Sequence, residues 1–155
     1  MRKEPVILSL LALLVGCAPV PQHRGYLFIM NKTDQTLYVE TNIISAAEPL
    51  DYCHSYEIIP GGLAGIANTE TKPEGERIVI ESFLTNPDDS RVDIFVKEGE
   101  ELVSVRTYTY ADKDISSKEL FNLNHCILND QEDPRKGFHV VKFFFEITTA
   151  DLLSN

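Results

Sequence analysis

Short segments rich in β-branched, aromatic and alternating apolar residues recur along the chain after residue 25. Alternation with a period of two places every second side chain on one face of a β-strand. The clearest example lies near the C-terminus, where Val141, Phe143, Phe145 and Ile147 fall on one face. We therefore expect strands at residues 26–30, 36–41, 55–59, 77–83, 91–96, 102–110, 125–128 and 138–148.

Turn-forming residues separate these segments. Gly, Pro, Asn and Asp occur at residues 31–35, 60–62, 86–89 and 97–100. Seven or eight short strands joined by such turns predict an all-β fold, a single β-sandwich. An immunoglobulin-like strand order is one option within that class, although the buried Trp common there is missing because the chain has no Trp.

One short helix is expected near residues 117–122. Ser116 and Glu119 have the spacing of a capping box, in which the Ser side chain accepts from the Glu backbone N–H and the Glu side chain reaches back. Leu120 and Phe121 follow and give the segment an apolar side.

The first sixteen residues have the pattern of a signal peptide. Arg2 and Lys3 form a positive start, and an apolar run of ten residues extends from Val6 to Val15 with one interruption at Ser9. A helix needs roughly 20 apolar residues to cross a bilayer, so this run is too short for a permanent span. We expect residues 1–16 to be removed after export.

The end of this segment, Leu14-Val15-Gly16-Cys17, resembles the lipobox of bacterial lipoproteins. The resemblance implies that Cys17 carries a diacylglyceryl thioether, becomes the first mature residue and is acylated on its amine. Two or more acyl chains give stable membrane anchoring, whereas one gives marginal binding. The alternative is a secreted protein in which Cys17 has no such role. No acidic residue occurs at residues 18–22, which by the same resemblance favours the periplasmic face of the outer membrane.

Removal of residues 1–16 from the 155-residue chain leaves 139 residues, a length that suits one domain. We expect a lipidated tether at residues 17–25 and a β-sandwich domain at residues 26–155. The formal charge of the whole chain is −10 and residues 1–16 contribute +1, so the mature chain carries −11. This acidity argues against a nucleic-acid partner and against peripheral docking on anionic lipid. It favours solubility, and the alternative explanation is a cationic partner or calcium.

Short motifs occur along the mature chain. Asn31-Lys32-Thr33 precedes Leu37-Tyr38-Val39, Ile59-Pro60-Gly61-Gly62 follows, and Arg106-Thr107-Tyr108 leads to Glu119-Leu120 and Asn124. These motifs resemble small β-sandwich lipoproteins of the Bacteroides type, although those proteins often have Trp where His125 stands. The resemblance implies the sandwich fold and attachment to the envelope as a lipoprotein, and it implies no activity.

Two cysteines, Cys53 and Cys126, remain once Cys17 is acylated. An even pair of cysteines in an oxidising compartment predicts a disulfide. The competing interpretation is a metal site, because His54 follows Cys53 and His125 precedes Cys126. Adjacent strand residues point to opposite faces, so these four side chains converge on one ion only if a bulge or loop intervenes.

Arg106, Tyr108 and Tyr110 share one face of the expected strand at residues 102–110. They either pack against a neighbouring element or form an exposed aromatic platform for a glycan or protein partner. Residues 112–116 begin like a calcium loop, but Ser117 and Leu123 stand where such a loop needs Gly and Glu. Residues 130–133 form a second acidic segment, for which solvation is the simpler explanation.

The chain contains no Gly-x-Ser-x-Gly, His-Glu-x-x-His or phosphate-loop motif. We therefore expect no enzymatic activity, no cofactor and no bound metal. The leading hypothesis is a non-enzymatic, lipid-anchored envelope module that binds a protein or glycan partner. The alternatives are a structural or accessory subunit of an outer-membrane assembly and a hydrolase without a recognisable motif.

Overall fold

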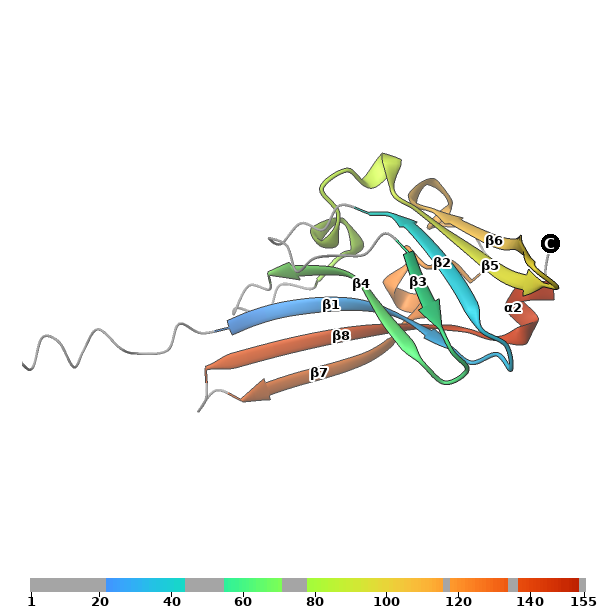
Figure 1. The fold of residues 1–155 in the computed structure, drawn as a ribbon. Coiled ribbons are helices and arrows are strands. Elements are labelled where there is room, and N and C mark those ends of the chain that lie inside the picture. The colour runs from blue at the N-terminus through green and yellow to red at the C-terminus, as the bar shows by residue number, and fades with distance from the viewer. Residues whose placement is uncertain (1–21, 44–54, 71–77, 116–117, 134–136, 154–155) are drawn as a thin grey trace, which may run out of the picture.

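The computed structural model describes residues 22–43, 55–70, 78–115, 118–133 and 137–153. These residues form two four-stranded sheets packed face to face (Figure 1). The strand orders are β4-β1-β8-β7 in the first sheet and β3-β2-β5-β6 in the second. The strands are β1 (Gln22–Asn31), β2 (Leu37–Asn42), β3 (Ser55–Ile58), β4 (Leu63–Glu70), β5 (Arg91–Glu98), β6 (Glu101–Thr109), β7 (Ile127–Asp133) and β8 (Phe138–Ile147). The predicted all-β sandwich of seven or eight strands is confirmed.

Three hairpins, two further antiparallel pairs (β1-β4 and β2-β5) and one parallel pair build the two sheets. Hairpins β2-β3, β5-β6 and β7-β8 each stay within one sheet, and β1 runs parallel to β8 in the first sheet. The immunoglobulin-like order is not adopted. In that order the second and third strands lie in different sheets, whereas here β2 and β3 pair directly.

Residues on the inner faces of the two sheets form the core. The predicted alternation on β8 is confirmed, because its inward side chains are buried while its outward ones stay partly exposed. Tyr108 and Phe145 meet at the centre edge to face, with ring centroids 5.2 Å apart. Burial of each large apolar side chain contributes roughly 1.5–3 kcal/mol. The fully buried large side chains are Tyr108, Phe83, Phe121, Phe145, Leu27, Ile29, Leu37, Ile66, Ile94, Leu120, Ile147 and Val39.

The prediction of a helix near residues 117–122 is wrong. Leu120 and Phe121 lie in a turn that leads into a short 3-10 helix, η4 (Leu123–His125), while residues 116–117 lie outside the described part of the chain. The physical reason is burial: Glu119, Leu120 and Phe121 are consecutive and all buried, a pattern that a surface helix cannot provide. The Glu119 side chain pairs with Arg106 at 3.5 Å.

A capping interaction is instead made by α2 (Thr149–Leu153), which follows β8. Asp151 accepts hydrogen bonds from the Thr148 backbone N–H and hydroxyl, both at 2.7 Å. This is the reciprocal half of a capping box, in which the third helical residue satisfies the N-terminal cap. No helix among the described residues has the length and apolar character needed to cross a membrane.

Other boundaries also differ from the prediction, including that of β7, which spans Ile127–Asp133 where a strand at residues 125–128 was expected. Residues 80–83, expected in a strand, form the 3-10 helix η1 (Ile80–Phe83), and Ile80 and Phe83 are both buried because a 3-10 helix aligns residues three apart. Strand β4 was not predicted, since a bulge at Ile66 disrupts its alternation and leaves four consecutive residues buried. Strand β1 begins at Gln22, so residues 22–25 belong to the sheet and not to the tether.

Asn31, in the predicted turn, uses its whole side chain to join three segments. Its amide nitrogen donates to the Gln35 and Ile58 carbonyls, both at 2.8 Å, and its side-chain oxygen accepts from the Thr33 backbone N–H and hydroxyl. The side chain is fully buried. Asn31 therefore fixes the β1–β2 turn against the end of β3.

We expect Asn31→Asp to destabilise the protein by about 2–4 kcal/mol, although the two side chains have nearly the same shape. The substitution replaces the side-chain donor of Asn31 with an acceptor, so the Ile58 carbonyl loses its side-chain donor and the Gln35 carbonyl keeps only the Thr33 hydroxyl. Urea unfolding followed by circular dichroism measures the change, with exposed Asn129→Asp on β7 as the control. Equal midpoints for the two variants would contradict this role.

Candidate functional site

A bulge in β6 determines where the three residues of the predicted ligand face lie. Val103 pairs with Val96 and Ser104 with Phe95, but the next pair is Arg106 with Ile94, so Val105 is the extra residue. The bulge turns Arg106 and Tyr108 toward the core. Tyr108 is 1% exposed, and burial raises the pKa of its hydroxyl above the ordinary value. The exposed-platform interpretation is therefore wrong for Tyr108, and the packing interpretation is right.

Arg106 holds the connection between β6 and β7 against the sheet. Its guanidinium lies 3.5 Å from the Glu119 carboxylate and 5.4 Å from the centre of the Tyr108 ring. The Glu119 backbone N–H donates to His125 Nδ1 at 2.9 Å. Arg106 thus orders this connection and does not contribute to an exposed surface for a partner.

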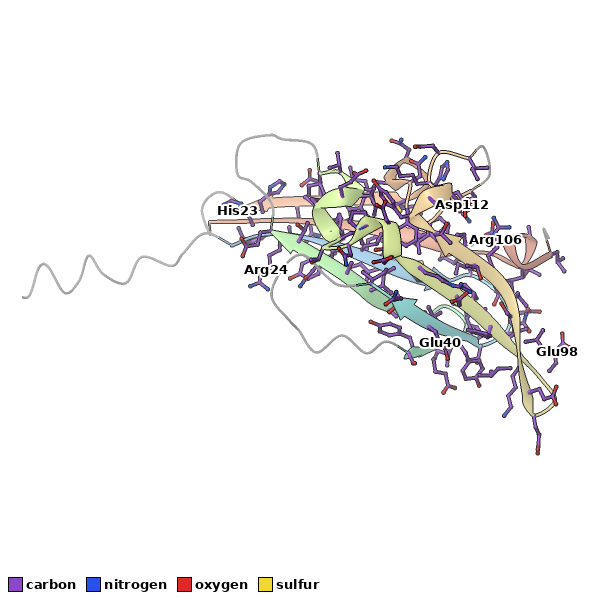
Figure 2. The ribbon with its side chains drawn as sticks, turned by 90° about the horizontal axis from the view of Figure 1, so that it is seen from above. His23, Arg24, Glu40, Glu98, Arg106 and Asp112 are labelled. Carbon is purple, nitrogen blue, oxygen red and sulfur yellow. The ribbon has the colours of Figure 1, made fainter. Side chains whose placement is uncertain are left out.

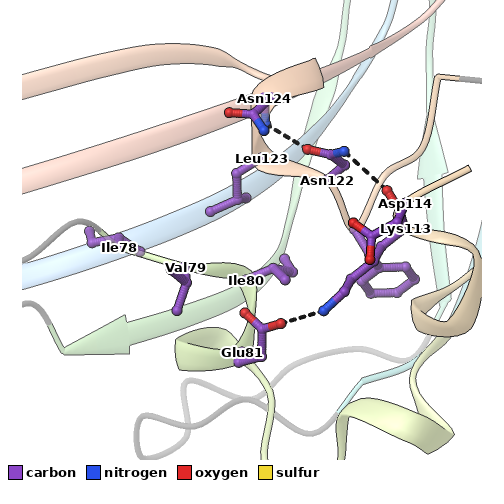
Figure 3. Close-up of a pocket in the computed structure, with 10 residues that line it drawn as sticks. Ile78, Val79, Ile80, Glu81, Lys113, Asp114, Asn122, Leu123 and Asn124 are labelled. Carbon is purple, nitrogen blue, oxygen red and sulfur yellow. Dashed lines mark hydrogen bonds and ion pairs between the residues drawn. The ribbon is translucent and has the colours of Figure 1, made fainter. Parts of the chain in front are cut away.

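Tyr110, the third predicted residue, lies at the edge of a pocket. It begins the 3-10 helix η3 (Tyr110–Asp112), directly after β6. The pocket lies between η1, the turn that follows η3, and η4, and has a volume of about 260 Å³ (Figure 3). The residues that line it are Ile78, Val79, Ile80, Glu81, Lys113, Asp114, Phe121, Asn122, Leu123 and Asn124.

A charged pair forms one side of this pocket. The Lys113 ammonium donates to Glu81 Oε1 at 2.5 Å (Figure 3). The Tyr110 hydroxyl donates to the same oxygen, also at 2.5 Å. Partial burial by itself would raise the pKa of the Glu81 carboxyl, but hydrogen bonds from Lys113 and Tyr110 outweigh it and hold the pKa at about 2. The hydrogen bond to Glu81 raises the pKa of the Lys113 ammonium. Both groups are therefore charged at neutral pH.

Amide groups form the opposite side. The Asn122 side chain donates to the Lys113 carbonyl at 3.0 Å and accepts from the Asn124 backbone N–H at 3.1 Å. These bonds fix the turn into η4 and hold the amide of Asn122 at the pocket wall (Figure 3). Buried Ile80 and Phe121 supply apolar surface beneath. The pocket therefore combines an apolar base with fixed hydrogen-bonding groups, as small-ligand sites do.

The sequence did not indicate Glu81, Lys113 or Asn122. They come from two connections between the sheets, where no strand periodicity or spaced motif marks them. The one available signal was the pair of Asn residues at 122 and 124, a residue type that commonly caps short turns.

The remaining predicted site residues are three cysteines. Cys17 and Cys53 lie outside the described residues. Cys126 is partly buried, and burial raises the pKa of its thiol to about 12. It forms no disulfide with a described residue, and its bond to Cys53 stays a prediction.

The two acidic segments considered for calcium are engaged with protein groups. Asp112 accepts from the Thr109 hydroxyl at 2.6 Å, and Asp130 lies 2.8 Å from His139 Nε2. Within the described ranges, no group of three or more His, Cys, Asp or Glu side chains is placed to hold a metal ion.

Glu81→Gln is expected to remove a pH-dependent part of the stability. Because the folded pKa of Glu81 is about 2, below its ordinary value of 4.5, its contribution is present above pH 4.5 and is lost as the pH falls toward 2. The Glu81 side chain is 42% exposed, so the contribution is less than about 1 kcal/mol after solvent screening. Unfolding curves of the parent and Glu81→Gln should differ at pH 6 and converge near pH 2. Lys113→Met should remove the same pH dependence, and a difference that persists at pH 2 would contradict this assignment.

The comparisons with known proteins do not place the chain in a family. No protein-family model matches the chain, and no curated protein matches it. A solved structure with some likeness is the dioxygenase domain of a dioxygenase and carbohydrate-binding protein fusion from Streptomyces sp. SirexAA-E. The alignment covers 84% of this chain and 83% of that one at 10% identity, with a TM-score of 0.31. Likeness at that level carries no argument about activity.

Proposed function

We propose that this chain is a lipid-anchored protein of the bacterial envelope that binds a glycan or protein partner without transforming it. The observation that carries the proposal is the pocket between η1, the turn that follows η3, and η4, with an apolar base, a charged pair and amide groups in one small space. Such a pocket orients a ligand by hydrogen bonds and excludes water from its apolar part.

The charges of the pocket favour binding over catalysis. A general base works best when its pKa lies near the working pH, whereas the pKa of Glu81 is about 2. A nucleophilic amine must lose its proton, whereas the pKa of Lys113 is raised. Each group therefore keeps a constant charge at neutral pH, which suits recognition of a polar ligand.

The proposed location in the cell envelope rests on the sequence. The signal-peptide pattern and the likeness of Leu14-Val15-Gly16-Cys17 to a lipobox support export and acylation at Cys17. The sandwich begins at Gln22, only five residues beyond that cysteine. On this proposal the protein is held close to the membrane, most favourably the outer membrane on its periplasmic side.

The binding proposal is tested with the mature protein on an array of bacterial envelope glycans, and in cells with a photo-crosslinking amino acid at Val79. Val79 lines the pocket and is 49% exposed, and Leu102 at 52% exposure is the matched control outside it. We expect a bound glycan or a crosslinked protein at Val79 only.

Glu81→Gln should weaken that signal by about tenfold, equivalent to ~1.4 kcal/mol. Asp93→Asn removes a comparable ion-paired carboxylate on β5 and should change nothing. Turnover of an envelope polymer that Glu81→Gln abolishes would contradict the proposal.

A further inference from the structure

The outer face of the first sheet carries an aromatic strip that the pocket does not use. On β1 and β8, alternation places Leu27 and Phe145 in the core and leaves Tyr26, Phe28 and Phe144 partly exposed on the opposite side. Phe28 pairs with Phe144 across the parallel strands, and their rings stack with centroids 5.2 Å apart. The Tyr26 ring lies 6.1 Å from that of Phe28. The three rings therefore form one continuous surface.

The strip extends to both edges of the sheet. Gly65 of β4 lies opposite Phe28, and a Cβ there would lie 3.3 Å from the Phe28 ring, so glycine leaves room for the aromatic side chain. Leu63 of β4 and Ile127 of β7 are 52% and 53% exposed. Together these residues form what we call the aromatic face, which comprises Tyr26, Phe28, Met30, Leu63, Phe144 and Ile127.

The charges around the aromatic face differ from those of the whole chain. Among the described residues, three cations, Arg24, Lys32 and Lys142, lie on or beside it, and three acidic residues, Glu70, Glu146 and by strand register Asp133, accompany them, so the formal charges balance although the chain carries −10 overall. The outer face of the second sheet is more acidic. There Glu40, Glu57 and Asp93 outnumber Arg91 and Lys97. The overall acidity, which argues against docking on anionic lipid, therefore does not apply to this face.

The anchor lies within reach of the same sheet. Strand β1 supplies Tyr26 and Phe28 and begins at Gln22, five residues after Cys17. Five residues span at most about 18 Å. His23 and Arg24 mark this end of the domain, and Glu98 lies at the opposite end (Figure 2). An acyl group on Cys17 would therefore hold the start of the aromatic face near the bilayer surface.

We propose that the aromatic face lies on the phospholipid surface in which Cys17 is anchored. The proposal rests on the proposed function, because it requires acylation of Cys17. Aromatic rings, exposed aliphatic side chains and Lys or Arg at the margin are the composition found where proteins meet the membrane interface. The stems of Lys142 and Arg24 cover apolar surface while their charges reach the headgroups. The pocket is built from connections between the sheets, and none of its lining residues belongs to the aromatic face.

The chain contains no Trp, so a single substitution introduces a unique fluorophore. Phe28→Trp and Phe144→Trp report on the aromatic face, and Phe95→Trp is the matched control on the outer face of the second sheet, opposite Tyr38. Each full-length precursor is processed in cells, and the acylated product is placed in phosphatidylethanolamine and phosphatidylglycerol vesicles with brominated acyl chains. We expect loss of fluorescence for the first two variants and none for the control. Either of the first two variants suffices if the other fails to fold.

Equal fluorescence in brominated and unbrominated vesicles for a folded, acylated variant of the aromatic face would overturn the proposal. Quenching of the control to the same extent would also overturn it. A soluble glycan that shifts the Phe28→Trp emission without vesicles would show a glycan surface instead. Failure of radiolabelled palmitate to enter the protein would refute the proposed anchor, which is a separate outcome from absence of quenching.

Discussion

Phe145→Ala is expected to lower the free energy of unfolding by about 3–5 kcal/mol, which approaches the whole stability of a small domain. Phe145 is completely buried on β8 and meets Tyr108 edge to face across the two sheets. Its removal leaves a cavity between layers that β-sheet pairing holds apart, so the surroundings cannot collapse fully. Urea denaturation followed by circular dichroism measures the loss.

The adjacent residue is the control. Phe144 has the same side chain but lies on the aromatic face, partly exposed and stacked on Phe28. Phe144→Ala should therefore cost only about 1 kcal/mol, the value of one exposed cross-strand aromatic pair. Because a slip of one residue would exchange the two faces, the pair of variants tests the register of β8 directly. Equal costs for the two variants would show that this register is wrong.

The strands of the sandwich were predictable where alternation is uninterrupted. On β8 every inward residue from Val141 to Ile147 is apolar and every outward one is partly exposed, so pattern and structure agree. The same holds for β5, where Val92, Ile94 and Val96 face the core. In such a strand the burial of one face already determines the register, so the sequence pattern is enough to predict which residues point inward.

The prediction failed where a bulge adds one residue to a strand, and where the burial of a few neighbouring side chains overrides a local sequence signal. The bulge at Val105 reverses the faces of β6, and no sequence pattern marks it, so the sequence left open whether Tyr108 packs inward or faces a partner. The segment at Glu119–Phe121 resembles a helix start, but its side chains pack inward against Arg106 and the core. Tertiary packing overrides a local capping signal there.

The pocket was not predictable for a related reason. Glu81 and Lys113 are 32 residues apart and meet because the β4–β5 and β6–β7 connections cross the same open side of the sandwich. Whether two connections come together in this way depends on the strand order, which the sequence pattern left undetermined. Tyr110 alone was indicated in advance, and only as part of a strand face that the bulge and η3 rearrange.

Replacement of Cys17 by Ser is expected to abolish incorporation of radiolabelled palmitate. A hydroxyl is a far weaker nucleophile than a thiolate, so no thioether forms at residue 17. The matched control is Cys126→Ser, which removes a partly buried thiol whose pKa is raised to about 12 and which should leave labelling unchanged.

Cys17→Ser also separates the contribution of the acyl chains to membrane binding from the contribution of the aromatic face. Each buried acyl CH₂ contributes roughly 0.8 kcal/mol, so the loss of two or three chains removes most of the membrane affinity. With Cys17→Ser behind a cleavable secretory signal, we expect the exported protein to appear in the soluble fraction after an alkaline wash, while the parent stays with the membrane. Label retained by Cys17→Ser would place the acyl group elsewhere. Membrane retention without label would mean that contacts such as those of Phe28 and Phe144 are sufficient by themselves, which the modest area of an aromatic strip does not support.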